Sequence, residues 1–290
     1  MVNLAIIDSD SIAYLGGKED SLQQILEKVD NKIQEILLET KADYYVLLVS
    51  KGKYFRHEIS KSKESPEGTY KANRTYGEQI WVKTIKEYLI AKYKAVWYPN
   101  LEADDVAVWL MNKTLYFHTD EGIITDSNKC WNTILDVPEV NKILVAKDKD
   151  LLYSIPGKHL NFSKKLGQDT WGMEWVETSE EEAANFKALQ LLMGDSSDGV
   201  DALKGVGPKK AQKIIDEWEN DSIEGYILNR YIEYYNDASK AIYEFQKNYR
   251  LLHMLSTNED FMREVGYIPS LPEFQKVIKQ EEVKVNEIDF

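Results

Sequence analysis

The chain of 290 residues is long enough for one large α/β domain, or for such a domain with a smaller helical annex. Its single cysteine, Cys130, excludes an intramolecular disulfide, and the lack of a basic leader or a long apolar run excludes a signal peptide and a membrane span. We therefore expect a soluble intracellular protein. The formal net charge of −13 argues at first against a nucleic-acid partner, because phosphate binding requires Lys and Arg.

Strands and helices are expected to alternate in the first part of the chain. Short apolar runs predict buried strands at residues 4–7, 44–49, 95–98 and 142–146. Apolar side chains at helical spacing predict helices at 19–39, 78–94 and 101–112. This alternation predicts an α/β fold with a mostly parallel central sheet flanked by helices.

After about residue 180 the pattern is almost wholly helical, with helices expected at 181–193, 207–218, 223–236 and 238–255. We place a boundary there, which gives an α/β core at 1–180 and a helical C-terminal domain at 181–290. The last residues, 280–290, are acidic, and we expect them to be frayed.

Acidic residues cluster in four short motifs, and Asp8 and Asp148 directly follow buried strands, where functional groups of parallel sheets gather. Grouped carboxylates repel one another, so a cation must offset their charge, and hard oxygen ligands suit Mg²⁺ or Mn²⁺. Two such ions can activate a water and stabilise the leaving oxygen of a phosphodiester. The candidate metal ligands are Asp8, Asp10, Glu102, Asp104, Asp105, Asp148, Asp150, Asp195 and Asp198.

Each acidic pair taken alone could simply cap a helix. Four pairs, two of them at strand ends, make that coincidence hard to sustain. Other chemistries lack their motifs: the four histidines show no zinc spacing, and no Gly-Lys pair completes a phosphate-binding loop.

A glycine-rich turn is the second signal. Gly205 and Gly207 let the backbone approach a phosphate, and Pro208 suits the first turn of a helix whose N–H groups point at it. Lys209 and Lys210 add positive charge. The alternative is an ordinary turn before a helix, but the position shortly after Asp195 and Asp198 favours phosphate binding.

The segment at about 51–94 is basic, with eleven Lys or Arg against five Glu. Aromatic residues alternate with the basic ones around Arg56, Tyr70, Lys71 and Arg74, a pattern that suits stacking on unpaired bases and contacts to phosphates. A solvated basic loop is the alternative interpretation.

Together these motifs resemble the 5′-nuclease (flap endonuclease) superfamily, in the order in which that family carries them. The resemblance runs from residue 4 to about 215. It includes Asp8, Tyr70-Lys71-Ala72-Asn73-Arg74, Leu101 to Asp105, Ala146 to Leu151 and Gly194 to Gly199, followed by Gly205-Val206-Gly207-Pro208-Lys209. The length of the chain suggests a stand-alone, bacteriophage-type 5′–3′ exonuclease.

The resemblance implies a PIN-like core, a basic gateway at about 51–94 and a helix–three-turn–helix duplex clamp at about 188–216. It implies hydrolysis at 5′ ends or flaps of duplex DNA, or of RNA–DNA primers, with two or more Mg²⁺ or Mn²⁺ ions. Lys71 and Arg74 would act in catalysis, while Arg56, Tyr70, Gly205, Gly207, Lys209 and Lys210 would join them in binding DNA. It also implies a K⁺ ion at 205–207.

A monomer in the cytoplasm of a bacterial or phage-infected cell is expected, with a replication protein as a further partner of the C-terminal tail. One departure stands out, because the family usually carries an aspartate after the second strand, where this chain reads Val49-Ser50-Lys51. Two alternatives therefore stay open: a catalytically weakened DNA-junction-binding protein, and a PIN-like RNase.

Overall fold

The computed structural model describes residues 1–15, 20–63, 65–66, 68–72, 81–118, 122–125, 139–166, 171–218 and 222–278. Its central six-stranded sheet has the order β10–β2–β1–β5–β6–β7. The four inner strands run parallel, whereas β10 and β7 are antiparallel at the two edges. The strands are β1 Asn3–Asp8, β2 Tyr44–Leu48, β5 Asn141–Ala146, β6 Gly157–Lys165, β7 Trp171–Thr178 and β10 Gln275–Lys276. The expected mostly parallel α/β sheet is confirmed.

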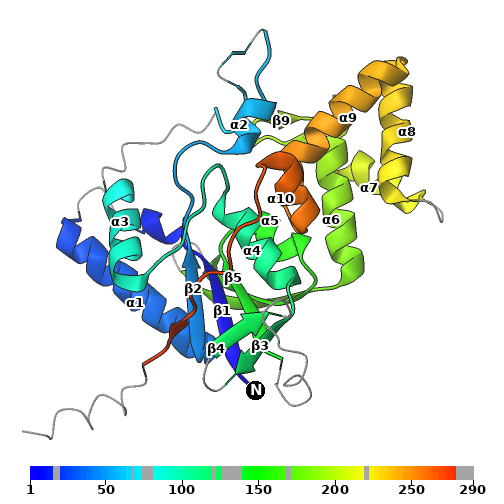
Figure 1. Ribbon diagram of the computed structural model, residues 1–290. Helices are drawn as coiled ribbons and strands as arrows, with labels where there is room; N and C mark the ends of the chain where they lie inside the picture. Colours follow the sequence, from blue (N-terminus) through cyan, green and yellow to red (C-terminus); the bar gives the residue numbers. More distant parts are fainter. Residues whose placement is uncertain are drawn as a thin grey trace, which may run out of the picture.

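Helices cover both faces of the sheet (Figure 1). Successive strand residues point to opposite faces, so Leu4 and Ile6 enter one core while Ala5 and Ile7 enter the other. On one side lie α1 (Leu22–Thr40) and α3 (Val82–Tyr93), and on the other lies α4 (Ala103–Asn112) with α10 (Asn258–Glu264) packed against it. Burial on both faces explains why the parallel strands are continuously apolar.

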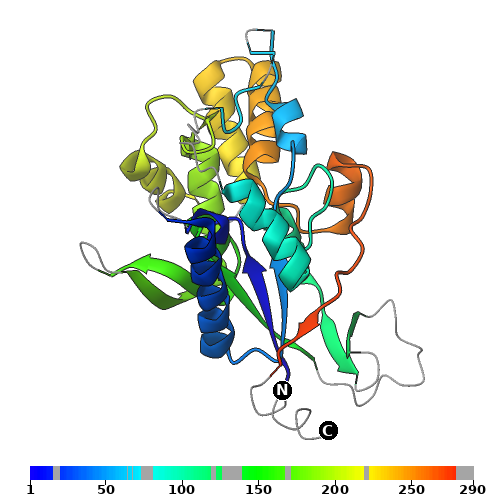
Figure 2. The ribbon, with the colours of Figure 1, turned by 90° about the vertical axis from the view of Figure 1, so that its left-hand side faces the viewer.

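The helical part packs around its own core of buried apolar residues beyond the carboxyl ends of the parallel strands (Figures 1 and 2). It consists of α6 (Glu180–Met193), α7 (Pro208–Asp216), α8 (Ile223–Tyr235) and α9 (Ala238–Leu252). Tyr231 is fully buried there, and its hydroxyl donates to the carbonyl of Leu191 at 2.7 Å. This placement puts the helices next to the edge of the sheet where the acidic residues end up.

Several short elements were not predicted from the pattern of apolar residues. Among them are η1 (Ile12–Tyr14), α2 (Phe55–Ile59), β3 (Leu115–His118), β4 (Gly122–Thr125), α5 (Lys149–Ser154), β8 (Gly194–Asp195) and β9 (Val200–Asp201). The longer strands β6 and β7, and α10 and β10 near the end of the chain, were not predicted either. The strand expected at 95–98 is reduced to a single bridge between Leu48 and Val96. Pro99 lacks an N–H donor and Asn100 has a φ of 61°, so the chain turns away toward α4.

The end of the described chain returns to the α/β part. Phe261 in α10 is fully buried and contacts Trp109 edge to face, and Val277 donates from its amide to the carbonyl of Asp43. The boundary near residue 180 stays a prediction. Although α10 and β10 come after that residue in the sequence, they pack on the α/β part that comes before it. Over the residues described, no helix is both long and apolar enough to cross a lipid bilayer.

Candidate active site

The parallel strands bring four separate acidic motifs together at one edge of the sheet. Asp8 ends β1 and Asp148 follows β5, and the two strands are paired neighbours in the sheet. The charge of Asp148 helps to raise the pKa of Asp8, and the charges of Asp8 and Asp148 help to raise the pKa of Asp104. A cleft of about 30 Å³ beside them is lined by six of the predicted ligands, Glu102, Asp104, Asp148, Asp150, Asp195 and Asp198.

Local turns hold these carboxylates at their positions. Asp148 is the N-cap of α5, and its side chain accepts from the amide of Asp150 at 3.0 Å. Asp195 accepts from the amide and the hydroxyl of Ser197 at 2.7 and 2.6 Å. Glu102 is the N-cap of α4. Two acids of the centre, Glu102 and Asp148, are thus also the N-cap residues at which helices begin.

The acids in the middle of the centre have raised pKa values, so their ionised forms are disfavoured unless a cation offsets their charge. Burial and the neighbouring charge of Asp10 raise the pKa of Asp8 to about 8. Burial and the charges of Asp8 and Asp148 raise the pKa of Asp104 well above its usual range. Burial and Asp148 also raise the pKa of Asp150 to about 8, and Asp150 Oδ1 is buried without a hydrogen-bond partner in the described chain.

Lys71 neutralises one part of the centre. Its ammonium donates to Glu102 and lies 3.8 Å from a carboxylate oxygen of Asp198. The hydroxyl of Tyr70, which is buried, donates to Glu102 at 2.8 Å. Burial alone would raise the pKa of Glu102, but Lys71 and Arg56 lower it below the usual value. Glu102 is therefore ionised and paired at neutral pH.

A second lysine, Lys86, was not predicted as a site residue. Its ammonium lies 2.7 Å from Asp10 Oδ1 and donates to the carbonyl of Ser50 at 2.9 Å. The amide of Ser50 also donates to Asp10 Oδ1 at 2.9 Å, and its hydroxyl accepts from the amide of Ala103. Lys86 belongs to no motif and is one basic residue among many in its segment, so the sequence contained no signal for it.

Arg56 and Asp105 form a buried ion pair. Arg56 was predicted to contact DNA and Asp105 to bind metal. The two terminal nitrogens of Arg56 donate to Asp105 at 2.8 and 2.7 Å, and one of them also donates to Glu102 at 3.0 Å. Its remaining contacts are with the carbonyls of Leu251 and His253. Asp105 also accepts from the amide of Leu255. With exposures of 3% and 0%, both side chains are buried and connect α2, α4 and the end of α9, although Arg56 also lines the carboxylate cleft.

The glycine hairpin has the backbone geometry that its sequence predicted. Gly205 has a φ of 80°, and Gly207 is the N-cap of α7. Lys209 and Lys210 are exposed in the first turn of that helix. Arg74 lies outside the described residues, so its catalytic role stays a prediction.

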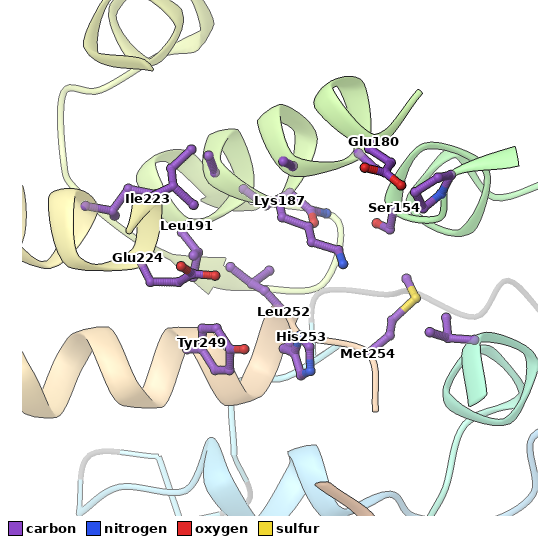
Figure 3. Close-up of a pocket in the computed structure, with 17 residues that line it drawn as sticks. Ser154, Glu180, Lys187, Leu191, Ile223, Glu224, Tyr249, Leu252, His253 and Met254 are labelled. Carbon is purple, nitrogen blue, oxygen red and sulfur yellow. The ribbon is translucent and has the colours of Figure 1, made fainter. Parts of the chain in front are cut away.

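A cavity of about 270 Å³ lies between α6, α8 and α9, on the other side of a shared wall (Figure 3). Gln190 and Leu252 line both this cavity and the carboxylate cleft. Lys187, Glu224 and His253 are among its polar residues. Its lining includes no predicted metal ligand, so it is separate from the acidic centre.

No family model matches the chain. The DNA polymerase I of Caldicellulosiruptor bescii is 30% identical over 197 residues, which are 66% of this chain and 20% of the polymerase. The 5′-3′ exonuclease of Bacillus subtilis is 34% identical over 100 residues, which are 32% of this chain and 34% of the exonuclease. The chain thus spans about a fifth and about a third of the length of these two curated relatives.

Solved structures of a bacteriophage T5 protein are similar over nearly the whole chain. One, crystallised with metal ions, has a TM-score of 0.57 at 20% identity and covers 87% of this chain and 90% of its own. Another, described as a T5 flap endonuclease complex with DNA and metal ions, has a TM-score of 0.54 at 18% identity over 86% and 88%. The chain thus resembles parts of these two bacterial proteins in sequence and has the fold of the bacteriophage T5 protein.

Proposed function

We propose that the protein is a structure-specific 5′-nuclease, a metal-dependent hydrolase that cuts phosphodiester bonds at 5′ ends or flaps of duplex DNA and leaves 5′-phosphates. The acidic centre at the end of the parallel sheet is the observation that carries this proposal. A protein that only bound DNA would gain nothing from collecting Asp8, Asp104, Asp148 and Asp150 in one place, because carboxylates repel phosphates. RNA–DNA hybrids are a further substrate class of the proposal.

Divalent cations fit the chemistry of this donor set. The acids supply hard oxygen ligands, and the buried Asp150 Oδ1 has no hydrogen-bond partner among the described residues. In the described part of the chain, no three such side chains already converge closely enough to hold an ion. Asp8, Asp104, Asp148 and Asp150 would close around Mg²⁺ or Mn²⁺, which would offset their mutual repulsion. When bound, two ions would supply an activated water and charge stabilisation of the leaving oxygen.

Lys71 would act on the phosphate directly. Lys71 lines the cleft and its ammonium donates to Glu102, so the side chain would turn from Glu102 toward a phosphate that enters the cleft. The backbone amide of Lys71 donates to the carbonyl of Asp198 at 2.7 Å, which fixes the base of the side chain beside the cleft. Its ammonium would then face the charge that develops on the phosphate. We propose a similar role for Arg74.

The hairpin at 203–207 would hold the duplex part of the substrate. Gly205 and Gly207 expose backbone groups to a phosphate, and Lys209 and Lys210 add charge at the start of α7. A K⁺ ion at 205–207, bound by backbone carbonyls, belongs to this proposal. The placement of the acidic centre away from these lysines would separate duplex binding from cleavage.

Cleavage of a 5′-labelled flap duplex and a matched nicked duplex, with Mg²⁺, with Mn²⁺ and with EDTA, tests the proposal. We expect metal-dependent products released from the 5′ end, and product lengths that separate exonuclease from flap cutting. Asp148→Asn should abolish cleavage yet keep flap binding. A second candidate function is a DNA-junction-binding protein, which is favoured by Ser50 at the position where the family usually carries an aspartate. Tight flap binding without cleavage, with either metal, would establish that function instead.

A further inference from the structure

Lys86 is held rigidly against the acidic centre. It lies in α3, whose Ile85 and Leu89 are buried against the sheet and η1 with 1% and 0% of their surface exposed. The hydroxyls of Tyr88 and Tyr93 on the same helix donate to Asp30 of α1 at 2.8 and 2.6 Å. Figure 1 shows α3 lying beside α1. These contacts fix the helix on both sides of Lys86, so its side chain is placed by the fold.

The ammonium of Lys86 occupies the position next to Asp10 where a cation would bind. Asp10 Oδ1 receives this ammonium at 2.7 Å and the amide of Ser50 at 2.9 Å, while the carbonyl of Ser50 accepts from the ammonium at 2.9 Å. One carboxylate oxygen and one carbonyl oxygen thus already share a positive charge. The two side chains are only 20% and 29% exposed, so water screens this pair weakly.

Asp10 consequently differs from the acids in the middle of the centre. Asp104 and Asp150 line the cleft and have no lysine within ion-pair distance in the described chain. Asp10 does not line the cleft and is paired with Lys86. A divalent ion at Asp10 would have to displace an ammonium that the helix holds in place.

We propose that Lys86 is a positioning residue that keeps Asp10 paired, so that Asp10 holds no divalent cation and the acidic centre binds one ion fewer than its carboxylates would otherwise allow. The inference rests on the proposed function, in that it assumes a divalent-ion site at Asp8, Asp104, Asp148 and Asp150. It adds to that function that Lys86 of α3 helps to determine how many divalent ions the acidic centre binds.

The number of Mn²⁺ ions bound without DNA tests this inference, measured by titration calorimetry and by the electron paramagnetic resonance signal of free Mn²⁺. Lys86→Met removes the ammonium and keeps most of the aliphatic stem. Lys83→Met is the matched control, because Lys83 lies in the same helix, is 87% exposed and pairs only weakly with Glu87 at 4.0 Å. A double variant combines Lys86→Met with Asp10→Asn.

We expect Lys86→Met to bind one more Mn²⁺ than the unchanged protein, and both the control and the double variant to bind the unchanged number. The same count in Lys86→Met as in the unchanged protein would overturn the inference. If melting curves show that Lys86→Met does not fold, Asp10→Asn decides: an unchanged count supports the inference, and a loss of one ion overturns it.

Failure of the proposed function would look different. Mn²⁺ binding without cleavage of any flap or nicked duplex would refute the nuclease and leave the role of Lys86 intact. A chain that binds no Mn²⁺ in any of these forms would overturn both.

Discussion

Replacing Asp105 by Asn tests whether this carboxylate stabilises the fold or holds a metal ion. Its oxygens accept from both terminal nitrogens of Arg56 at 2.8 and 2.7 Å and from the amide of Leu255 at 3.0 Å. Both side chains are buried, so water cannot replace the lost charge. Removing one partner of a buried pair costs about 3–5 kcal/mol. We expect the free energy of unfolding to fall by that amount, which corresponds to about 10 °C in melting temperature.

Replacing the neighbouring Asp104 by Asn should have a different effect. Burial and the charges of Asp8 and Asp148 raise the pKa of Asp104 well above its usual range, so its ionised form destabilises the protein in the absence of metal. An amide of nearly the same shape removes this repulsion. We expect unchanged or higher stability without metal, and loss of cleavage.

Urea unfolding in EDTA and in Mg²⁺ separates the two roles. The unchanged protein and Asp105→Asn should both gain stability from Mg²⁺, because a ligand that binds only the folded state stabilises it. Asp104→Asn should lose most of that gain. Wild-type stability of Asp105→Asn in EDTA, together with loss of its Mg²⁺-dependent gain, would refute the structural role and restore Asp105 as a metal ligand.

Three further outcomes are expected. Without divalent ions, the free energy of unfolding should fall as pH rises from 3.8 to about 8. Burial and nearby carboxylates raise the pKa values of Asp8 and Asp150 to about 8, so the folded chain retains protons that the unfolded chain releases. Urea midpoints that stay level over this pH range would contradict this. Lys71→Ala should slow single-turnover cleavage by about 10²–10³-fold with flap affinity nearly unchanged, and an unchanged rate would remove its role. The double change of Lys209 and Lys210 to Ala should lower the slope of log affinity against log salt by about 2 in duplex-binding titrations; an unaltered slope would place the duplex elsewhere.

The location of the acidic centre could be predicted because its determinants are local. Asp8 and Asp148 follow apolar runs, and paired parallel strands must end at the same edge of the sheet. The role of each acid could not be predicted in the same way. Asp104 and Asp105 are adjacent in the first turn of α4, about 100° apart around the helix, so one faces the cleft and the other faces Arg56. Only the position of α2 decides which is which.

The net charge of the chain shows the same dependence on tertiary structure. A total of −13 argues against a phosphate partner only if acidic and basic residues are mixed evenly over the molecule. Here carboxylates gather in one cleft, where Lys71 and Arg56 neutralise only part of them, while Lys209 and Lys210 stand exposed on α7. The acidic surplus is therefore concentrated where divalent cations would bind, and the surface that would meet the DNA backbone keeps its positive charge.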